Sequence, residues 1–284
     1  MKDIISEYET DVVEYFKNKA ADYDRVDEQV YWRLSDSILW HTFNEYILKN
    51  LPSNFSFLDA GGGTGRWSEK ILTSYQSASG VICDLSEDML LQAALKQKKI
   101  GVERLALLNG SIENMQDIPD NSFDLVFNFH NVIGFVSNYK KMISELTRVL
   151  KKGGTLVTLA PNYYHMIYFN ISCGRFKEAS NVLKNGRGTF VSGMPEMFVF
   201  TPRQLRDLYC DNNITISMIT GFPITIYPGY LETQIEGSTS SLIDVLETKN
   251  GFDAIMEIEK RLITTGGDEI ASRGNNIFIS GVKK

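Results

Sequence analysis

Glycines and carboxylates with the spacing of a nucleoside site gather between residues 55 and 84. The stretch Phe55–Trp67, FSFLDAGGGTGRW, begins as a short apolar strand, reaches Asp59, and continues into the glycines of Gly61–Gly65. A strand that leads through glycines into a helix presents backbone N–H groups to a ligand at close range. Asp84 ends the next apolar run, where a carboxylate can accept hydrogen bonds from both hydroxyls of a ribose. These residues predict recognition of a nucleoside.

The glycine turn matches two common nucleotide-binding signatures poorly. In the dinucleotide fingerprint G-x-G-x-x-G, Arg66 holds the place of the third glycine, so the pattern indicates NAD only weakly. The phosphate-binding pattern G-x-x-x-x-G-K-S/T does not occur in the sequence. The turn therefore indicates a nucleoside ligand without a phosphate-gripping loop.

Alternating strand and helix patterns surround the turn. Short apolar runs separated by stretches of helical periodicity predict an α/β fold with a doubly wound, mostly parallel seven-stranded sheet. Ligands bind such sheets at the carboxyl ends of the strands. The last run follows the sixth without an ordinary crossover, so we expect it to pair antiparallel at the sheet edge. The runs are residues 55–58, 80–84, 104–108, 123–129, 155–160, 214–220 and 276–282.

The other segments are predicted to cover the sheet and to close the site. Apolar residues at helical spacing predict helices at 3–20 and 27–49, so residues 1–50 are expected to form an N-terminal helical cover. Residues 162–200 and 222–275 show weak periodicity, apart from a helix near 241–262, and insertions of this length are often lids. We therefore expect one domain over residues 1–284, with both insertions enclosing the substrate.

Four segments, in the right order, resemble the class I S-adenosylmethionine-dependent methyltransferases. Leu58–Gly65 resembles the first motif of that family, hydrophobic-D-x-G-x-G-x-G, and Asp84 falls where the family places its ribose-binding acid. Asn121–Val126 resembles the family's fourth strand, and Leu146–Thr155 resembles its turn into the fifth. The resemblance covers residues 55–160 and implies a Rossmann-like fold, with S-adenosyl-L-methionine as cofactor and S-adenosyl-L-homocysteine as product.

The resemblance also implies roles for residues at the first two strand ends. Asp59, Gly61 and Gly63 would hold the methionine portion of the cofactor. Asp84 would bind the ribose.

Further along the chain, the resemblance implies an adenine site. Leu85 and Met89 would flank the adenine, although core packing alone would also explain Met89. Many relatives carry Gly-Asp-Ala after the third strand, whereas this chain has Gly110, Ser111 and Ile112. The hydroxyl of Ser111 would therefore accept the hydrogen bond that a carboxylate accepts in those relatives.

Three more residues complete the implied cofactor site. Asn128 and Phe129, at the end of the fourth strand, would approach the amino acid part of the cofactor. Tyr23, in the break between the two predicted cover helices, matches a tyrosine that often contacts the cofactor in relatives.

His130 is the candidate catalytic residue. It follows the fourth strand, near the expected position of the methyl group, and could act as a general base or orient the acceptor. A purely structural role is the alternative. The aromatic cluster at residues 162–165 could likewise stack on an acceptor, hold a cationic amine, or form the apolar core of a lid.

Composition narrows the partners that we expect. The net charge of −6 disfavours a nucleic-acid-binding surface, and the Asp/Asn-Pro-Pro-Tyr/Phe motif of base-methylating relatives is absent after the fourth strand. No apolar run is long enough to span a membrane, and the acidic N-terminus does not resemble a signal peptide. Three dispersed cysteines predict no structural metal site and favour a reduced, cytoplasmic protein.

The sequence thus predicts a methyltransferase that acts on an oxygen or nitrogen of a small molecule. Two alternatives stay open. One is a cofactor-binding accessory subunit without catalysis, and the other is an NAD-linked oxidoreductase.

Overall fold

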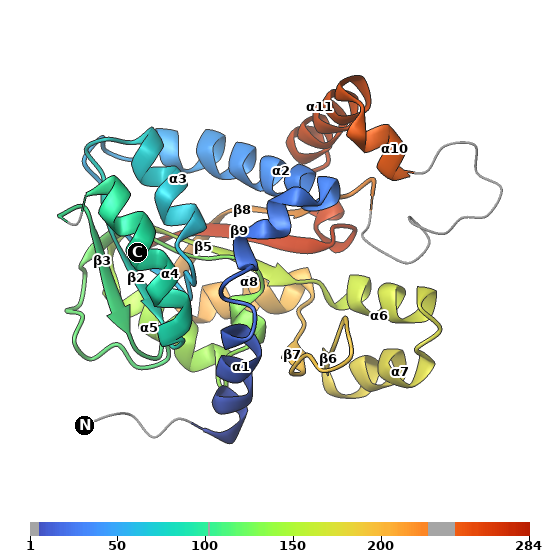
Figure 1. Ribbon diagram of the computed structural model, residues 1–284, viewed down its shortest axis with the longest axis horizontal. Coiled ribbons are helices and arrows are strands. Elements are labelled where there is room, and N and C mark those ends of the chain that lie inside the picture. Colours follow the sequence, from blue (N-terminus) through green and yellow to red (C-terminus); the bar gives the residue numbers. More distant parts are fainter. Residues whose placement is uncertain (1–5, 102, 227–241) are drawn as a thin grey trace.

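A seven-stranded sheet runs through the part of the chain that the computed structural model describes, residues 6–101, 103–226 and 242–284 (Figure 1). Its strand order is β3-β2-β1-β4-β5-β9-β8, parallel from β3 to β5, with β9 antiparallel to both of its neighbours. The predicted α/β fold with a mostly parallel seven-stranded sheet is confirmed. The strands are β1 (Ser56–Ala60), β2 (Ser79–Asp84), β3 (Leu105–Asn109), β4 (Phe123–Asn128), β5 (Leu150–Pro161), β8 (Ile214–Phe222) and β9 (Asn276–Lys283).

The position of β9 inside the sheet, with β8 at the edge, follows from two different burial patterns. The first six residues of β9, from Asn276 to Gly281, are all buried, whereas the first half of β8 alternates between buried and exposed positions. Strands buried on both faces belong inside a sheet, and strands that alternate suit an edge. Accordingly, β9 lies between β5 and β8, and β8 is the outermost strand.

Each face of the sheet is covered by its own set of helices. Phe57 and Phe127 point into one core, while their neighbours Leu58 and Val126 point into the other, as the period of two in a strand requires. Figure 1 shows α2 and α11 on one side of the sheet and α5 and α8 on the other. The helices around the sheet are α2 (Val30–Tyr46), α3 (Arg66–Ser74), α4 (Glu87–Ile100), α5 (Tyr139–Val149), α8 (Pro202–Asp211) and α11 (Lys249–Thr265).

The N-terminal residues divide into two parts with different positions. Helix α2 buries Leu34, Ile38 and Phe43 against the sheet, so it belongs to the core. Helix α1 (Glu7–Lys17) has no buried residue and stands apart from that core, joined to α2 through the short 3-10 helix η1 (Tyr23–Glu28). The capping box of Ser6 and Glu9 begins α1.

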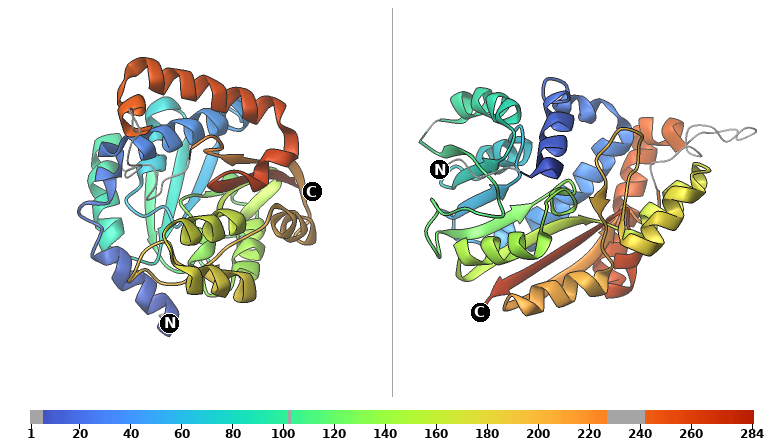
Figure 2. Two further views of the ribbon diagram at one scale, coloured as in Figure 1. Left: turned by 90° about the vertical axis from the view of Figure 1, so that its right-hand side faces the viewer. Right: turned by 90° about the horizontal axis from the view of Figure 1, so that it is seen from below.

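The two long insertions lie in different places. The first forms α6 (Tyr163–Ser172), α7 (Phe176–Asn185) and the small β6–β7 ladder (Arg187–Gly188 and Met197–Phe198), beyond the end of β5 (Figure 2). In the second, α10 (Leu242–Glu247) and α11 pack against α2, and Thr248 separates them because its hydroxyl caps α11. Residues 227–241 of this insertion lie outside the described residues.

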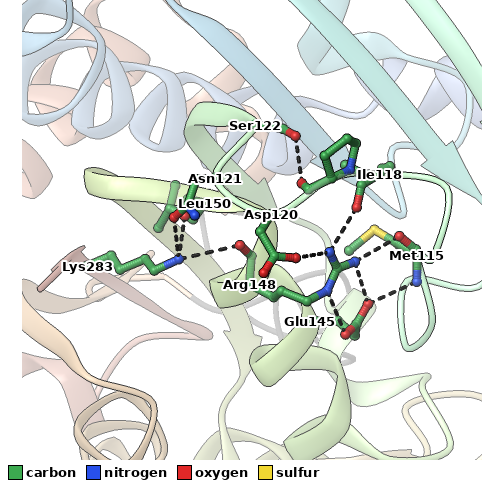
Figure 3. Close-up of polar contacts among 10 residues, drawn as sticks. Met115, Ile118, Asp120, Asn121, Ser122, Glu145, Arg148, Leu150 and Lys283 are labelled. Carbon is green, nitrogen blue, oxygen red and sulfur yellow. Dashed lines mark hydrogen bonds and ion pairs between the residues drawn. The ribbon is translucent and has the colours of Figure 1, made fainter.

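A partly buried ion-pair network fixes the loop between β3 and β4 to α5 (Figure 3). The Arg148 guanidinium donates hydrogen bonds to the carbonyls of Met115 and Ile118, each at 2.8 Å, and pairs with Glu145 at 3.0 Å. Glu145 in turn accepts a hydrogen bond from the N–H of Met115, and its contact with Arg148 lowers its pKa. Loop 110–122, which carries the predicted adenine site, is therefore anchored at its far end.

Candidate active site

The glycine turn follows β1 directly, near the middle of the sheet. Gly61 has a φ of +72°, and a Cβ there would lie 2.5 Å from Cγ1 of Val132. A Cβ on Gly62 would lie 2.5 Å from the carboxyl carbon of Asp59. Contacts this short do not occur in folded proteins, so both positions require glycine. The turn consequently packs directly against the Asp59 side chain.

Asp59 and Asp84 lie at the ends of β1 and β2, on either side of the turn. Asp59 is 2% exposed, accepts a 2.8 Å hydrogen bond from the Ser68 hydroxyl, and has its pKa raised by burial to about 7. Asp84 accepts hydrogen bonds from the backbone N–H groups of Gly63 (2.8 Å) and Ser86 (2.9 Å), and burial raises its pKa as well. Because both carboxyls are desolvated without a cationic partner in contact, a cationic ligand would stabilise their ionised forms.

A pocket, here called the turn pocket, opens over the glycines. Among its described lining residues, four carboxylates (Glu9, Asp59, Asp84 and Glu113) face one guanidinium, that of Arg66. This charge balance suits a ligand with positive charge. The predicted cofactor residues that line it are Tyr23, Asp59, Gly61, Gly63, Asp84, Leu85, Met89, Ser111, Ile112 and Phe129.

Asn128 is the predicted cofactor residue that does not line the turn pocket. Its side chain is fully buried, and its amide donates hydrogen bonds to Oγ1 of Thr158 (2.9 Å) and to the carbonyl of Val157 (3.3 Å). Phe129, one residue on, lines the pocket and packs edge-on against Trp67. Asn128 therefore connects β4 to β5 within the sheet.

The N-terminal segment closes one side of the turn pocket. Tyr23 lines the pocket from η1, and burial raises its pKa to about 12, so its hydroxyl stays protonated. Asp24 accepts a 2.6 Å hydrogen bond from the Thr64 hydroxyl and pairs with Lys96 of α4. Lys96 also donates to the carbonyl of Thr64 at 2.8 Å. These contacts join η1 to the glycine turn and to α4.

His130 lies at the far side of the turn pocket, in the left-handed backbone region with a φ of +52°. Its Nε2 accepts a 2.6 Å hydrogen bond from the indole N–H of Trp67. Because an indole N–H can only donate, the neutral His130 ring carries its proton on Nδ1. Asp36 Oδ1 lies 3.8 Å from Nε2, and Asp36 Oδ2 accepts a 2.7 Å hydrogen bond from Arg66.

A second, larger cavity of about 1170 Å³, here called the side cavity, lies next to the turn pocket. Its walls come from α1, η1 and the start of α2 on one side, and from α6 and residues 190–197 on the other. Five residues line both spaces and form the wall between them: Phe16, Tyr23, Arg66, His130 and Phe135. A molecule in the turn pocket and a molecule in the side cavity would therefore meet at this shared wall.

The insertions contribute unequally to the side cavity. Of the aromatic cluster at 162–165, His165 lines the cavity, whereas Tyr164 is 49% exposed. Asn162 is buried and donates hydrogen bonds to carbonyls of residues 271–274. From the described part of 222–275, Asn275 alone lines the cavity.

Several lining residues were not predicted from the sequence. In the sequence, Arg66 stands out only because it disrupts the dinucleotide fingerprint, and Phe16 only because it belongs to a helical pattern. Trp67 carried no signal beyond its place in the amphipathic run. The apolar face of α1, which buries nothing in the core, is the feature that could have indicated a helix placed over a ligand site.

The described residues contain neither a candidate membrane span nor a candidate metal site. No helix within residues 6–101, 103–226 and 242–284 is long and apolar enough to cross a membrane. Over the same ranges, no group of three or more histidine, cysteine or acidic side chains could hold a metal ion.

Comparisons with known proteins agree with this geometry. Residues 57–154 match the model of a methyltransferase domain. The chain is 26% identical over 145 residues to the tRNA 5-carboxymethoxyuridine methyltransferase of Escherichia coli (strain K12), covering 51% of this chain and 54% of that protein. It is 28% identical over 156 residues to the demethylmenaquinone methyltransferase of Listeria welshimeri, covering 53% and 62%. The chain thus spans less than two thirds of the length of these curated relatives.

A solved structure shares the fold over nearly the whole chain. It is the putative methyltransferase in the complex with the Haloferax volcanii Trm112 methyltransferase activator, with a TM-score of 0.61 and 15% identity, over 95% of this chain and 96% of that one. Residues 57–154 therefore match a methyltransferase domain, and the seven-stranded sheet has the fold of that solved methyltransferase. Solved methyltransferase structures of similar fold contain S-adenosyl-L-homocysteine or sinefungin.

Proposed function

We propose that the protein transfers a methyl group from S-adenosylmethionine to an oxygen or nitrogen of a small-molecule acceptor. The observation that carries the proposal is the wall of five residues shared by the turn pocket and the side cavity. Methyl transfer is an in-line displacement, so donor and acceptor must approach one point from opposite sides. Two adjoining spaces with a common wall provide that arrangement.

The turn pocket has the chemistry that S-adenosylmethionine requires. Asp59, with the glycines of the turn, would hold the methionine portion, because a buried carboxyl attracts its ammonium group. Asp84 would accept hydrogen bonds from the ribose hydroxyls. Leu85, Met89 and Ile112 line the turn pocket and would supply apolar surface for the adenine. When bound, the cofactor supplies a methyl group activated by a sulfonium.

Residues of the shared wall would exclude water and orient the two reactants. Phe16 packs edge-on against Phe135, with ring centroids 5.3 Å apart, and also contacts Tyr23. Tyr23 can donate a hydrogen bond from its protonated hydroxyl, but it would not act as a base near neutral pH. His130, fixed by Trp67, would position the acceptor instead of removing its proton.

The side cavity is the proposed acceptor site. Its volume of about 1170 Å³ is somewhat above the range of about 300–1,000 Å³ that is usual for small-molecule pockets. The acidic net charge of −6 disfavours a large polyanion on the protein surface. Residues 162–200 would cover the acceptor together with α1 and η1, while the described part of 222–275 would contribute mainly to the support of α2.

An RNA acceptor is the second candidate, because one curated relative is named as a tRNA methyltransferase. The experiment is a transfer assay with methyl-labelled S-adenosylmethionine, run separately on a small-molecule extract and on total tRNA. We expect label in a small-molecule product and none in RNA. Label that becomes acid-soluble only after ribonuclease treatment would favour the second candidate.

A matched variant controls this assay. Asp84→Asn should abolish most of the labelling, whereas Glu87→Gln, an exposed acid three residues away, should not change it. S-Adenosylhomocysteine binding without turnover in either extract would instead favour a cofactor-binding accessory subunit.

A further inference from the structure

The side cavity differs in charge from the rest of the molecule. Its described lining residues include four basic side chains (Lys19, Arg25, Arg66 and Arg175) and three acidic ones (Asp22, Glu28 and Asp36), in a protein with a net charge of −6. All three acids are already paired: Arg25 contacts Asp22 and Glu28, and Arg66 contacts Asp36. The cavity therefore contains positive charge that these acids do not neutralise.

Arg175 is the less exposed of the two cations that remain. It follows α6 and occupies the N-cap position of α7, where its side chain makes no capping hydrogen bond, and among the described residues it forms no ion pair. Its Nη2 donates to the carbonyls of Thr189 and Phe190, which holds the guanidinium in place. Its Nε is buried and has no hydrogen-bond partner in the described structure. A buried donor without a partner is costly, and the guanidinium, which is held in place and lines the side cavity, therefore has hydrogen-bonding capacity that the described protein does not use.

The groups around Arg175 reinforce this interpretation. The guanidinium lies over the Phe169 ring at 5.6 Å, and Phe169 packs edge-on against Phe190. All three residues line the side cavity. His165, on the same wall, has its pKa lowered by burial to about 4, so it adds no charge at neutral pH. Lys19, on the opposite wall, is exposed and contacts Tyr15 through its ammonium group.

We propose that the methyl acceptor carries an anionic group, a carboxylate or a phosphate, that Arg175 binds against the aromatic wall formed by Phe169 and Phe190. This inference rests on the proposed function, because it assigns the acceptor to the side cavity. The cationic side cavity then complements the acidic turn pocket: one suits an anionic acceptor, and the other suits a cationic methyl donor.

Calorimetry with simple aromatic probes tests the proposal. The full chain, saturated with S-adenosylhomocysteine, is titrated with phenyl phosphate, benzoate and the neutral analogue benzamide. A charged hydrogen bond contributes roughly 1.5–3 kcal/mol, so at least one anion should bind roughly ten- to a hundredfold more tightly than benzamide. The preference should decrease as salt is added.

Variants assign the preference to Arg175. Arg175→Gln should remove it while leaving S-adenosylhomocysteine affinity and the thermal unfolding midpoint unchanged. Arg175→Lys, which keeps the charge and can still reach a carbonyl, should retain part of the preference and so controls for a disturbed loop at residues 189–190. Lys177→Gln, an exposed neighbour on α7 that does not line the cavity, should behave like the wild type.

Three results would overturn the anion site: no binding of either anion at millimolar concentration, equal binding of benzoate and benzamide, or an Arg175→Gln variant with its preference intact. Failure of the proposed function has a different signature. In that case the wild type would not bind S-adenosylhomocysteine, whereas the anions, titrated in its absence, would still distinguish Arg175→Gln from the wild type.

Discussion

The indole N–H of Trp67 donates a 2.6 Å hydrogen bond to Nε2 of His130, so the helix that follows the glycine turn determines the tautomer of the histidine beyond β4. With Nε2 engaged and the proton on Nδ1, the neutral ring has no available lone pair. A base role for His130 would require this hydrogen bond to break. The geometry favours a positioning role.

Replacement of His130 measures which role it has. We expect His130→Asn to lower kcat less than about tenfold, because general bases contribute about 10²–10⁴-fold and a positioning group contributes less. Asparagine tolerates the left-handed backbone at this position, so the fold should survive. The kcat-against-pH profile should keep its shape. A hundredfold decrease in kcat, together with the loss of one ionisation from the pH profile, would instead show that His130 acts as a general base.

Trp67→Phe is the companion variant. It removes the indole N–H and retains an aromatic ring against Phe129. If Trp67 acts through His130, the two substitutions affect one unit, so their effects should not add. The double variant Trp67→Phe/His130→Asn should then have a kcat no lower than that of the slower single variant. A rate above that of the wild type in Trp67→Phe would mean that the hydrogen bond restrains a base.

Asp84 should control cofactor affinity. In Asp84→Asn, a single carbonyl oxygen replaces two carboxylate oxygens that accept from Gly63 and Ser86, and one N–H loses its partner. We expect S-adenosylhomocysteine affinity to fall roughly ten- to a hundredfold, which corresponds to about 1.5–3 kcal/mol. Calorimetry measures it, with Glu87→Gln as the control. Unchanged affinity would contradict the ribose assignment.

The raised pKa of Asp59 predicts a pH-dependent stability. Its folded-state pKa of about 7 lies above the ordinary pKa of an aspartate, 3.8, so between these values the folded state binds a proton that the unfolded state releases. The contribution of Asp59 to the free energy of unfolding therefore decreases as pH rises from about 4 to about 7, by up to about 4 kcal/mol. Urea unfolding at pH 5 and pH 8 should show a smaller decrease in Asp59→Asn. If the free energy of unfolding decreased equally in both proteins between pH 5 and pH 8, the raised pKa would not belong to Asp59.

The same carboxyl predicts proton release on cofactor binding. If ionised Asp59 holds the ammonium of the methionine portion, affinity for S-adenosylhomocysteine should rise from pH 5.5 to 7.5. Calorimetry in buffers of different ionisation enthalpy counts the released proton. Asp59→Asn should release none, and similar release from this variant would locate the titrating group elsewhere.

Lys96 should control how long the cofactor remains bound. Its contacts with Asp24 and Thr64 hold η1 against the glycine turn. Lys96→Met should accelerate dissociation of S-adenosylhomocysteine several-fold, while the free energy of unfolding changes by about 1 kcal/mol or less, as for partly exposed ion pairs. Stopped-flow displacement measures the rate. Lys99→Met, which removes the exposed pair with Glu69, is the control. Equal dissociation rates for Lys96→Met and the wild type would show that η1 does not control release of the cofactor from the pocket.

The strand ends and the glycine turn could be predicted because they depend on local patterns. Alternation in FDLVFNF places Asn128, the last residue of β4, and Phe129, the residue after it, on opposite sides of the sheet, which is why the two do not reach the same pocket. Applied residue by residue, the period of two would have removed Asn128 from the predicted site. The pair of Trp67 and His130 joins residues 63 positions apart, and no local pattern reports such a contact.

The placement of α1 over the turn pocket depends on tertiary contacts of the same kind. Helical periodicity predicted the helix but not which surface it faces. Two ion pairs connect the N-terminal segment to the Rossmann-like core, Arg66–Asp36 and Lys96–Asp24. The spacing of these residues in the sequence does not predict either pair.

The position of β9 between β5 and β8 has a consequence for how the chain acquires its structure during synthesis. Strand β8 leaves the ribosome about 50 residues before β9, yet β9 is its neighbour in the sheet. Until residues 276–283 emerge, β8 has no partner among the described strands, and the edge of β5 that pairs with β9 stays unpaired. Completion of the sheet must therefore wait for β9, so premature termination before residue 276 would leave one edge of β5 and both edges of β8 unpaired, whereas on this side of the native sheet only the outer edge of β8 is unpaired.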